Sequence, residues 1–298
     1  MKLFVNDKEI TTHNGATVLD VIHGYYALRN KKLRLSLIVL LFFVLLTIFG
    51  PLLTEYGPKD FAGPPAQSPN SDYWFGTTTF GEDVFTQFVI GLRATLIVGL
   101  VGGGLGTLIG ILIGFTAGYR GGMVDEILNI LTNIVLVIPT MAVLLIIAAY
   151  LEVRSVATEC LFIGLTAWPW AARAIRAQTF SLRNREFVDL ARMSGKKSFN
   201  IIFTEVAPNM MSYLVMTFIL QFGGAILTAA TLDFIGLGPT NTISLGLIMQ
   251  YSVLWGALPL EIWWWFVPPG LAITLIVGSL YIMNVGLDEV FNPKLREM

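Results

Sequence analysis

Six long apolar segments recur along the chain and are separated by shorter polar stretches. They occupy residues 35–53, 85–118, 127–151, 156–172, 210–232 and 263–287. Roughly 20 apolar residues suffice to cross the hydrocarbon core of a bilayer as a helix, and the segments are close to that length or longer. The pattern therefore predicts an all-α membrane protein with six transmembrane helices.

The polar stretch between the fourth and fifth segments, residues 185–209, has a helical pattern of its own. Small or apolar residues recur at i, i+3, i+4 and i+7, which is typical of an amphipathic helix. One set is Phe187, Leu190, Ala191 and Ser194, and a second is Phe199, Ile202, Phe203 and Val206. Gly195 permits a helix-ending turn between them, and Pro208 suits the first turn of the next helix. We predict two short helices forming a compact knob; the alternative is an interfacial helix lying on the lipid headgroups.

The positions of Lys and Arg predict the orientation in the membrane, because basic residues accumulate on the cytoplasmic side. Thirteen of them lie within a few residues before the first segment, between the fourth and fifth, or after the sixth: Arg29, Lys31, Lys32, Arg34, Arg173, Arg176, Arg183, Arg185, Arg192, Lys196, Lys197, Lys294 and Arg296. The opposite loops contribute only Lys59 and Arg154. We therefore expect both termini and loop 185–209 inside, and the Pro- and Gly-rich loop 50–83 outside.

Composition narrows the class of protein. Hydrophobic residues make up 55% of the 298 positions and charged residues 13%, and the mean hydropathy is +0.71. These values exclude an ordinary soluble domain. The single cysteine, Cys160, cannot form an internal disulfide framework, and His13 and His23 both precede the first segment.

Catalytic chemistry is not expected. The chain has no G-x-x-x-x-G-K-[ST] phosphate loop and therefore no predicted ATP site. Glu159 and Asp233 are interpreted as isolated acids near the outer ends of segments, without a base, a metal or each other as a partner. Glu159 is taken as a residue at the end of a helix rather than as a proton carrier. We predict no enzyme activity, no cofactor, no metal and no nucleic-acid partner.

Three further features have simple structural interpretations. Glycines between 99 and 114 include small-xxx-small spacings that allow close helix packing, with a moving translocation path as the alternative. Trp263, Trp264 and Trp265 are interpreted as an aromatic belt at the membrane interface. Residues 1–30 show a hairpin-like alternation followed by a short helical pattern, which we interpret as a small cytoplasmic addition to the first segment.

Several motifs together resemble a known family. Loop 185–209 contains Asp189-Leu190-Ala191, Gly195 at the family spacing, and the ending Val206-Ala207-Pro208. Ala117-Gly118-Tyr119-Arg120-Gly121-Gly122 and the tail from Asp288 to Arg296 match as well. Residues 33–296 resemble the ABC-importer permeases of the dipeptide, oligopeptide and nickel branch, as the second, C-type membrane subunit.

The resemblance implies the type I importer fold, with six transmembrane helices and a cytoplasmic coupling helix in a prokaryotic inner or plasma membrane. It implies four partners besides the bilayer: a second homologous permease subunit, two ATP-binding subunits and an extracellular solute-binding protein. Residues that would couple to the ATPase are Glu186, Asp189, Leu190, Ala191, Ser194, Gly195, Phe199 and Pro208. It divides the chain into a cytoplasmic segment (1–33), the first helix with its external loop (34–84) and the permease domain (85–298).

Some positions depart from the family pattern. Asp189 replaces the usual Glu, Leu190 the usual Ala, and Glu205 a frequent His. Glu82 lies where an arginine is usual, and Ile130 and Asn133 lie where an arginine and an aspartate are common. A single unpaired charge within the membrane would be costly. The arginine and the aspartate are therefore expected to be absent together, as they are at Ile130 and Asn133.

The resemblance favours short peptides as the solute and leaves oligosaccharides and nickel chelates open. An ion-coupled secondary carrier is the alternative from another class, and it would require paired intramembrane acids or broken helices in matching halves. A membrane-embedded enzyme would require clustered His, Asp or Glu within the membrane, and the sequence shows no such cluster.

Overall fold

The computed structural model describes residues 30–291, and this part of the chain is helical throughout, apart from its loops. Its elements in chain order are α2 (Lys31–Phe49), η1 (Gly50–Leu53), α3 (Val84–Ile97), η2 (Val98–Gly102), α4 (Gly103–Arg120), α5 (Gly122–Val137), α6 (Thr140–Tyr150), α7 (Val156–Leu182), α8 (Glu186–Met193), α9 (Ser198–Ile201), η3 (Ile202–Val206), α10 (Ala207–Asn209), α11 (Met211–Phe234), α12 (Leu245–Leu254) and α13 (Trp263–Phe291). The all-α prediction is confirmed for the described residues. The hairpin and helix predicted within residues 1–30 lie outside that part of the chain, except for Asn30.

Four helical stretches are long and apolar enough to cross a membrane: Lys31–Leu53, Val84–Arg120, Met211–Phe234 and Trp263–Phe291. They correspond to the first, second, fifth and sixth predicted segments. The bent pair α5 and α6 would make a fifth crossing if it is one span. The fourth predicted segment is the start of α7, which continues ten residues past the predicted end at residue 172, as far as Leu182.

The third predicted segment is not one straight helix. α5 and α6 meet at an angle of 72°. Between them, Ile138 is extended at φ −75° and ψ 124°, and Pro139 follows. A proline disfavours the helical conformation of the residue before it and has no N–H to donate to the preceding turn. Pro139 therefore explains the bend.

Glycines hold α4 against α7. Gly106, Gly110, Gly114 and Gly118 repeat every four residues along α4, so they lie on one face. A Cβ on Gly110 would come within 2.6 Å of the Ala171 side chain, and one on Gly114 within 2.9 Å of the Ala172 carbonyl. The packing interpretation of these glycines is confirmed, because no side chain larger than hydrogen fits between the two helices.

Loop 50–83 folds back on itself without a regular element after η1. Thr77 and Thr78 are fully buried, and the backbone of residues 62–67 is hydrogen-bonded to that of residues 77–81. Trp264 donates its indole N–H to the Thr77 carbonyl at 3.2 Å, which attaches this loop to α13. Trp265 is only 1% exposed and packs in the hydrophobic core. The aromatic-belt interpretation is therefore wrong for Trp265, because its side chain faces the other helices.

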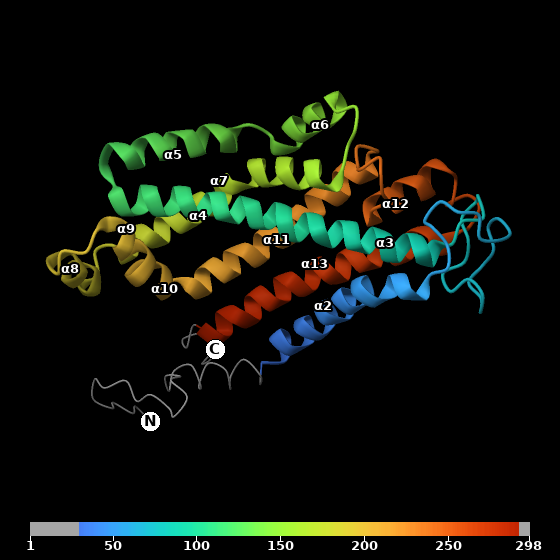
Figure 1. Cartoon of the computed structure of the whole chain (residues 1–298), viewed down its shortest axis with the longest axis horizontal. Coiled ribbons are helices and arrows are strands. Elements are labelled where there is room, and N and C mark those ends of the chain that lie inside the picture. The colour runs from blue at the N-terminus through green and yellow to red at the C-terminus, as the bar shows by residue number, and fades with distance from the viewer. Residues whose placement is uncertain (1–29, 292–298) are drawn as a thin grey trace.

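The long helices run alongside one another, and the two ends of the bundle differ (Figure 1). α8, α9 and α10 lie at one end, whereas loop 50–83 and α12 lie at the other. α12 begins at Ser244, whose hydroxyl accepts from the Leu247 N–H at 3.1 Å, and it packs against α11 and α13. The apolar pattern predicts no helix between residues 232 and 263, and α12 lies there.

Candidate functional site

Loop 185–209 forms the predicted helix, turn and second helix. α8 ends at Ser194, and Gly195 then adopts a positive φ of +75°. The Lys196 N–H donates to the Ala191 carbonyl at 3.2 Å, closing the turn in the manner of a glycine C-cap. Pro208 lies in the first turn of α10, and the chain turns again at Met210 before α11. The glycine turn and the two helical stretches are thus confirmed.

Buried apolar side chains attach this loop to the ends of α4 and α7. Val188, Ile201 and Val206 are at most 1% exposed and share a core with Phe115 and Ile175. Full burial of such a side chain stabilises a fold by about 1.5–3 kcal/mol. The loop is therefore a firmly packed part of the bundle.

The face of α8 that meets the bundle differs from the face that the spacing suggested. Val188 and Ala191 are buried, whereas Leu190 is 62% exposed and Ser194 is exposed. The i, i+3, i+4, i+7 set therefore does not mark the buried side of the helix. Of the eight candidate coupling residues, Ala191 is buried and the other seven are exposed: Glu186, Asp189, Leu190, Ser194, Gly195, Phe199 and Pro208.

Large apolar side chains project from the same loop into open space. Leu190, Met193, Phe199 and Phe203 are 62%, 77%, 69% and 46% exposed, and we call these four residues the tip surface. The rings of Phe199 and Phe203 lie 4.6 Å apart. Exposed apolar groups on a well-packed base are typical of a protein-binding surface.

Charged groups border the tip surface and brace the turn. Asp189 pairs with Arg192 at 2.9 Å on α8. Lys196 pairs with Glu205 at 2.6 Å, which joins the glycine turn to η3. The hydrogen bond from Lys196 lowers the pKa of Glu205. Glu205 therefore has a structural partner within the loop, which its departure from the family pattern did not suggest.

Arginines of α7 connect this end of the bundle to α5. Arg176 donates to both carboxylate oxygens of Asp125, at 2.5 and 2.7 Å. Arg173 donates to the Asn133 side-chain oxygen at 2.7 Å. Asn133 thus contacts a residue of another helix. A neutral amide at this position is enough to accept the hydrogen bond from Arg173. Sequence reasoning missed both contacts because the partners belong to segments far apart in the chain.

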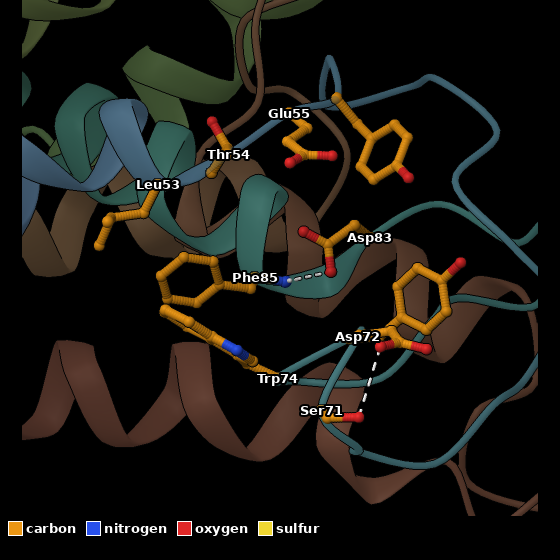
Figure 2. Close-up of a pocket in the computed structure, with 10 residues that line it drawn as sticks. Leu53, Thr54, Glu55, Ser71, Asp72, Trp74, Asp83 and Phe85 are labelled. Atoms are coloured by element: carbon orange, nitrogen blue, oxygen red, sulfur yellow. Dashed lines mark hydrogen bonds between the residues drawn. The ribbon is translucent and has the colours of Figure 1, made fainter.

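The opposite end of the molecule carries a cavity of about 350 Å³ between η1, loop 50–83 and the start of α3. Figure 2 shows the side chains of Glu55, Asp72 and Asp83 around it, with Trp74 against Phe85. Those two rings lie 4.9 Å apart. The cavity is therefore an acidic opening with an aromatic wall.

Glu82, next to this cavity, is used within the loop itself. Its carboxylate accepts from Gln87 at 2.7 Å and from Thr78 at 3.3 Å. Partial burial raises the pKa of Glu82. Where the family has an arginine, this chain thus has an acid that pins loop 50–83 to α3.

Glu159 and Asp233 are not isolated, contrary to the sequence interpretation. Glu159 lies near the start of α7 and Asp233 near the end of α11, and their carboxyl groups are in contact. Asp233 is 2% exposed. The expectation that the chain has no buried acid pair is therefore wrong, because antiparallel packing of two helices joins residues that no sequence motif links. Within residues 30–291 there is no cluster of three or more potential metal ligands.

Comparison with known proteins identifies the family. Residues 110–297 match the family described as the binding-protein-dependent transport system inner membrane component. The chain belongs to this family. Residues 27–73 match the N-terminal transmembrane domain of oligopeptide transport permease C. The chain is accordingly a non-catalytic permease subunit of a binding-protein-dependent ABC importer, and such a system includes ATPase and binding-protein components.

Curated relatives align over most of both chains. The dipeptide transport system permease protein DppC of Alkalihalophilus pseudofirmus is 32% identical over 275 residues, which cover 90% of this chain and 88% of the relative. The oligopeptide transport system permease protein OppC of Bacillus subtilis is 30% identical, with 90% and 87% covered. The probable D,D-dipeptide transport system permease protein DdpC of Escherichia coli is 29% identical, with 97% and 95% covered.

Proposed function

We propose that this permease subunit imports di- or oligopeptides and that loop 185–209 transmits the movement of an ATP-binding subunit to the membrane helices. The observation that carries the proposal is the exposed tip surface on a buried base. Peptides are proposed as solutes because the relatives above are named as dipeptide, oligopeptide and D,D-dipeptide permeases. Oligosaccharides and nickel chelates remain the alternative solutes.

The proposed contact with the ATPase is made by the exposed candidates. Leu190 and Phe199 would insert into the partner, with Glu186, Asp189 and Ser194 at the rim. Ala191 seats α8 on the bundle, while Gly195 and Pro208 set the path of the chain. Apolar anchors surrounded by polar residues are the usual composition of a strong protein interface.

A mechanical route from the tip surface into the membrane supports this role. The loop packs on α4 and α7, and α7 is one continuous helix of 27 residues. The glycine face of α4 keeps these two helices in close contact along their length. Close-packed interiors transmit displacement rather than absorb it. Movement of the loop would therefore carry α4 and α7 together.

We propose six crossings, with both termini and loop 185–209 inside and loop 50–83 outside. Asymmetry of Lys and Arg supports this orientation. The sixth crossing is α7, because it packs along α4, which spans. Glu159, Arg173 and Arg176 lower the hydropathy of α7, yet Arg173 and Arg176 are paired with α5. We also propose a division of the chain into a cytoplasmic segment (1–33), the first crossing with its external loop (34–84) and the permease domain with the other crossings (85–298).

Single cysteines test this topology. In a Cys160→Ala background, Ser68→Cys should react with an impermeant thiol reagent in sealed cells, and Ser198→Cys should not. Both positions are exposed in the structure, so accessibility depends on the side of the membrane alone. Labelling of Ser198→Cys from outside would refute the orientation.

Transport requires partners in this proposal: a second, non-identical permease subunit, two ATP-binding subunits and a solute-binding protein on the side of loop 50–83.

The contact between Glu159 and Asp233 is the observation that favours the rival function, an ion-coupled carrier. Liposomes separate the two. The complete system should take up peptide with ATP after ion gradients are collapsed, and the lone chain should take up none under a proton or sodium gradient. Gradient-driven uptake by the lone chain would refute the importer proposal, whereas ATP-driven uptake of a sugar would refute only the peptide.

A further inference from the structure

The contact between the start of α7 and the end of α11 contains two carboxyl groups, of which Asp233 is buried and Glu159 is half-buried. Asp233 is covered by two glycines: a Cβ at Gly238 would collide with its Oδ1, and one at Gly246 would lie 2.6 Å from its Cβ. Ser244 donates to the other oxygen, Oδ2, at 2.5 Å. The Asp233 carboxyl group is thus enclosed by two parts of the chain, the segment after α11 and the start of α12.

Each acid has one buried oxygen without a hydrogen-bond donor. These atoms are Oε1 of Glu159 and Oδ1 of Asp233. Glu159 and Gly238 line one small cavity, and Gly238 lies against Oδ1 of Asp233, so the two acidic side chains approach each other there. Two carboxylates in contact in a medium of low dielectric cannot both be ionised, and an unsatisfied buried charge is costly. One proton between them would remove the repulsion and give Asp233 a second donor beside Ser244, so that the single remaining negative charge is hydrogen-bonded.

We propose that Glu159 and Asp233 form a binding site for one proton, which the two carboxyl groups share and which fastens the outer end of α7 to that of α11. Glu159 carries the proton and donates it to Asp233, whose second oxygen already accepts from Ser244. When one proton is bound, the protonated carboxyl group of Glu159 becomes a hydrogen-bond donor to the carboxylate of Asp233. The site does not depend on the proposed transport function.

Neighbouring charges do not supply the missing positive charge. Arg154 precedes α7 and lines the same small cavity as Glu159, but its Nε donates to the Gly238 carbonyl at 3.1 Å, and within residues 30–291 no ion pair joins it to either acid. Cys160 follows Glu159 and is directed to the Ile97 carbonyl, 3.9 Å away. α6, η2 and α12, which also pack near this contact, contain no Asp, Glu, His, Lys or Arg.

A proton fits the surroundings better than a metal ion. Calcium requires six to eight oxygen ligands and magnesium a regular octahedron. Two carboxyl groups and the Ser244 hydroxyl fall short of either set, and Gly238 closes the side of Asp233 Oδ1. The adjoining cavity is about 30 Å³, which is room for one or two water molecules when each requires about 10–15 Å³.

The fastening role follows from the position of the pair. The Thr240 N–H and hydroxyl donate to the Arg154 carbonyl at 2.8 and 3.1 Å, so the segment after α11 is already attached to the segment before α7. Loss of the proton would place two negative charges at the centre of this contact. The outer ends of the two helices would then separate, and water would enter.

Infrared spectroscopy and thermal unfolding of the purified full chain in detergent test the site. Wild-type protein should show the C=O stretch of a protonated, buried carboxylic acid at neutral pH, and its unfolding temperature should fall as the pH is raised. The sign follows because the folded state binds a proton that the unfolded chain releases. Glu159→Gln keeps a donor for Asp233 and should abolish both the band and this pH dependence. Glu152→Gln, an exposed acid nearby, should leave both unchanged.

A second variant keeps the proposal testable if Glu159→Gln does not fold. Ser244→Ala removes the other donor to Asp233, so the pair should bind its proton more tightly and the band should persist to higher pH. A band unaffected by Glu159→Gln, or one that disappears at lower pH in Ser244→Ala, would overturn the proposal. Stabilisation of the wild type by Na⁺, K⁺, Ca²⁺ or Mg²⁺ that Glu159→Gln eliminates would also overturn it, in favour of a bound metal cation. Failure of peptide transport would not affect these readouts.

Discussion

Loop 185–209 and loop 50–83 both connect membrane helices and both expose large apolar side chains, but their backbones are held in place differently. Loop 50–83 buries Thr77 and Thr78 completely. Its backbone forms hydrogen bonds within the loop and accepts one from Trp264 of α13. Loop 185–209 leaves Leu190, Met193 and Phe199 more than 60% exposed at its end. Gly81 in the first loop is crowded by Gly63, whereas Gly195 in the second has no atom within 4 Å of a Cβ.

The difference indicates what each loop contributes to the subunit. A loop with its own core and hydrogen bonds keeps its shape without a partner. A loop with a buried base and an apolar end has half of an interface, since such groups are normally covered in an assembled complex. We therefore expect substitutions in loop 50–83 to affect folding and substitutions in loop 185–209 to affect assembly and coupling.

The largest effect is expected from Gly81→Ala in loop 50–83. Gly81 has a φ of +75°, and its Cβ would collide with the Gly63 carbonyl. Strained backbone and overpacking together should cost about 3 kcal/mol or more in the free energy of unfolding. Gly224→Ala is the control, because that helical glycine has open space around it. Equal unfolding temperatures for the two variants would contradict the self-contained packing of loop 50–83.

Gly195→Val should affect coupling and spare the rest of the subunit. A β-branched residue is disfavoured at φ +75° by its own backbone. No atom of another residue lies within 4 Å of a Cβ at this position, so the strain is purely local. The strain, about 1–3 kcal/mol, should shift α8 relative to α9. Solute-stimulated ATP hydrolysis by the assembled transporter should collapse while membrane insertion continues. Gly195→Asn should retain more activity, since asparagine tolerates this conformation better; equal, normal activity of both variants would remove the turn from the mechanism.

Leu190→Ala should weaken binding of the ATP-binding subunit by roughly tenfold, the effect of losing about 1.4 kcal/mol at an interface. Leu258→Ala is matched to it, because Leu258 is similarly exposed, at 58%, near the opposite end of the molecule. Binding can be measured on the purified subunit in detergent. A comparable loss of affinity in both variants would show that the tip surface has no special role.

The smallest effect is expected from Glu205→Gln. Lys196 lowers the pKa of Glu205, so the ion pair is present at neutral pH and its contribution is lost as the pH falls through the pKa of the folded state. Both side chains are partly exposed, and solvent screens such pairs. ATP hydrolysis by wild type and Glu205→Gln should therefore differ slightly at neutral pH and converge at acidic pH. A difference that grows on acidification would show that Glu205 acts in another way.

Sequence predicted the features that depend on nearby residues. Long apolar runs identified most of the spans because length alone decides whether a helix can cross a bilayer. Gly195 marked the turn because a positive φ favours glycine locally. Pro139 lies inside the apolar run of residues 127–151, where a proline signals a bend. α12 was missed because an apolar helix of ten residues is too short to register as a span.

Features that depend on packing between distant segments were not predictable. Val188 rather than Leu190 faces the bundle because of how loop 185–209 sits on α4 and α7. Trp265 looked interfacial by composition, yet α13 turns it into the core. Glu159 and Asp233 meet only because α7 and α11 pack antiparallel, and no motif links them. A single sequence does not state which faces of its helices will meet.

Protection of a cysteine at the tip surface tests the central claim most directly. Leu190→Cys in a Cys160→Ala background should react with a maleimide in inside-out vesicles that contain the permease subunits alone. Addition of the ATP-binding subunits should block that reaction, and Ser68→Cys should stay unreactive in both cases because it faces the vesicle lumen. Equal labelling of Leu190→Cys with and without the ATP-binding subunits would contradict the assignment of loop 185–209 as the coupling element.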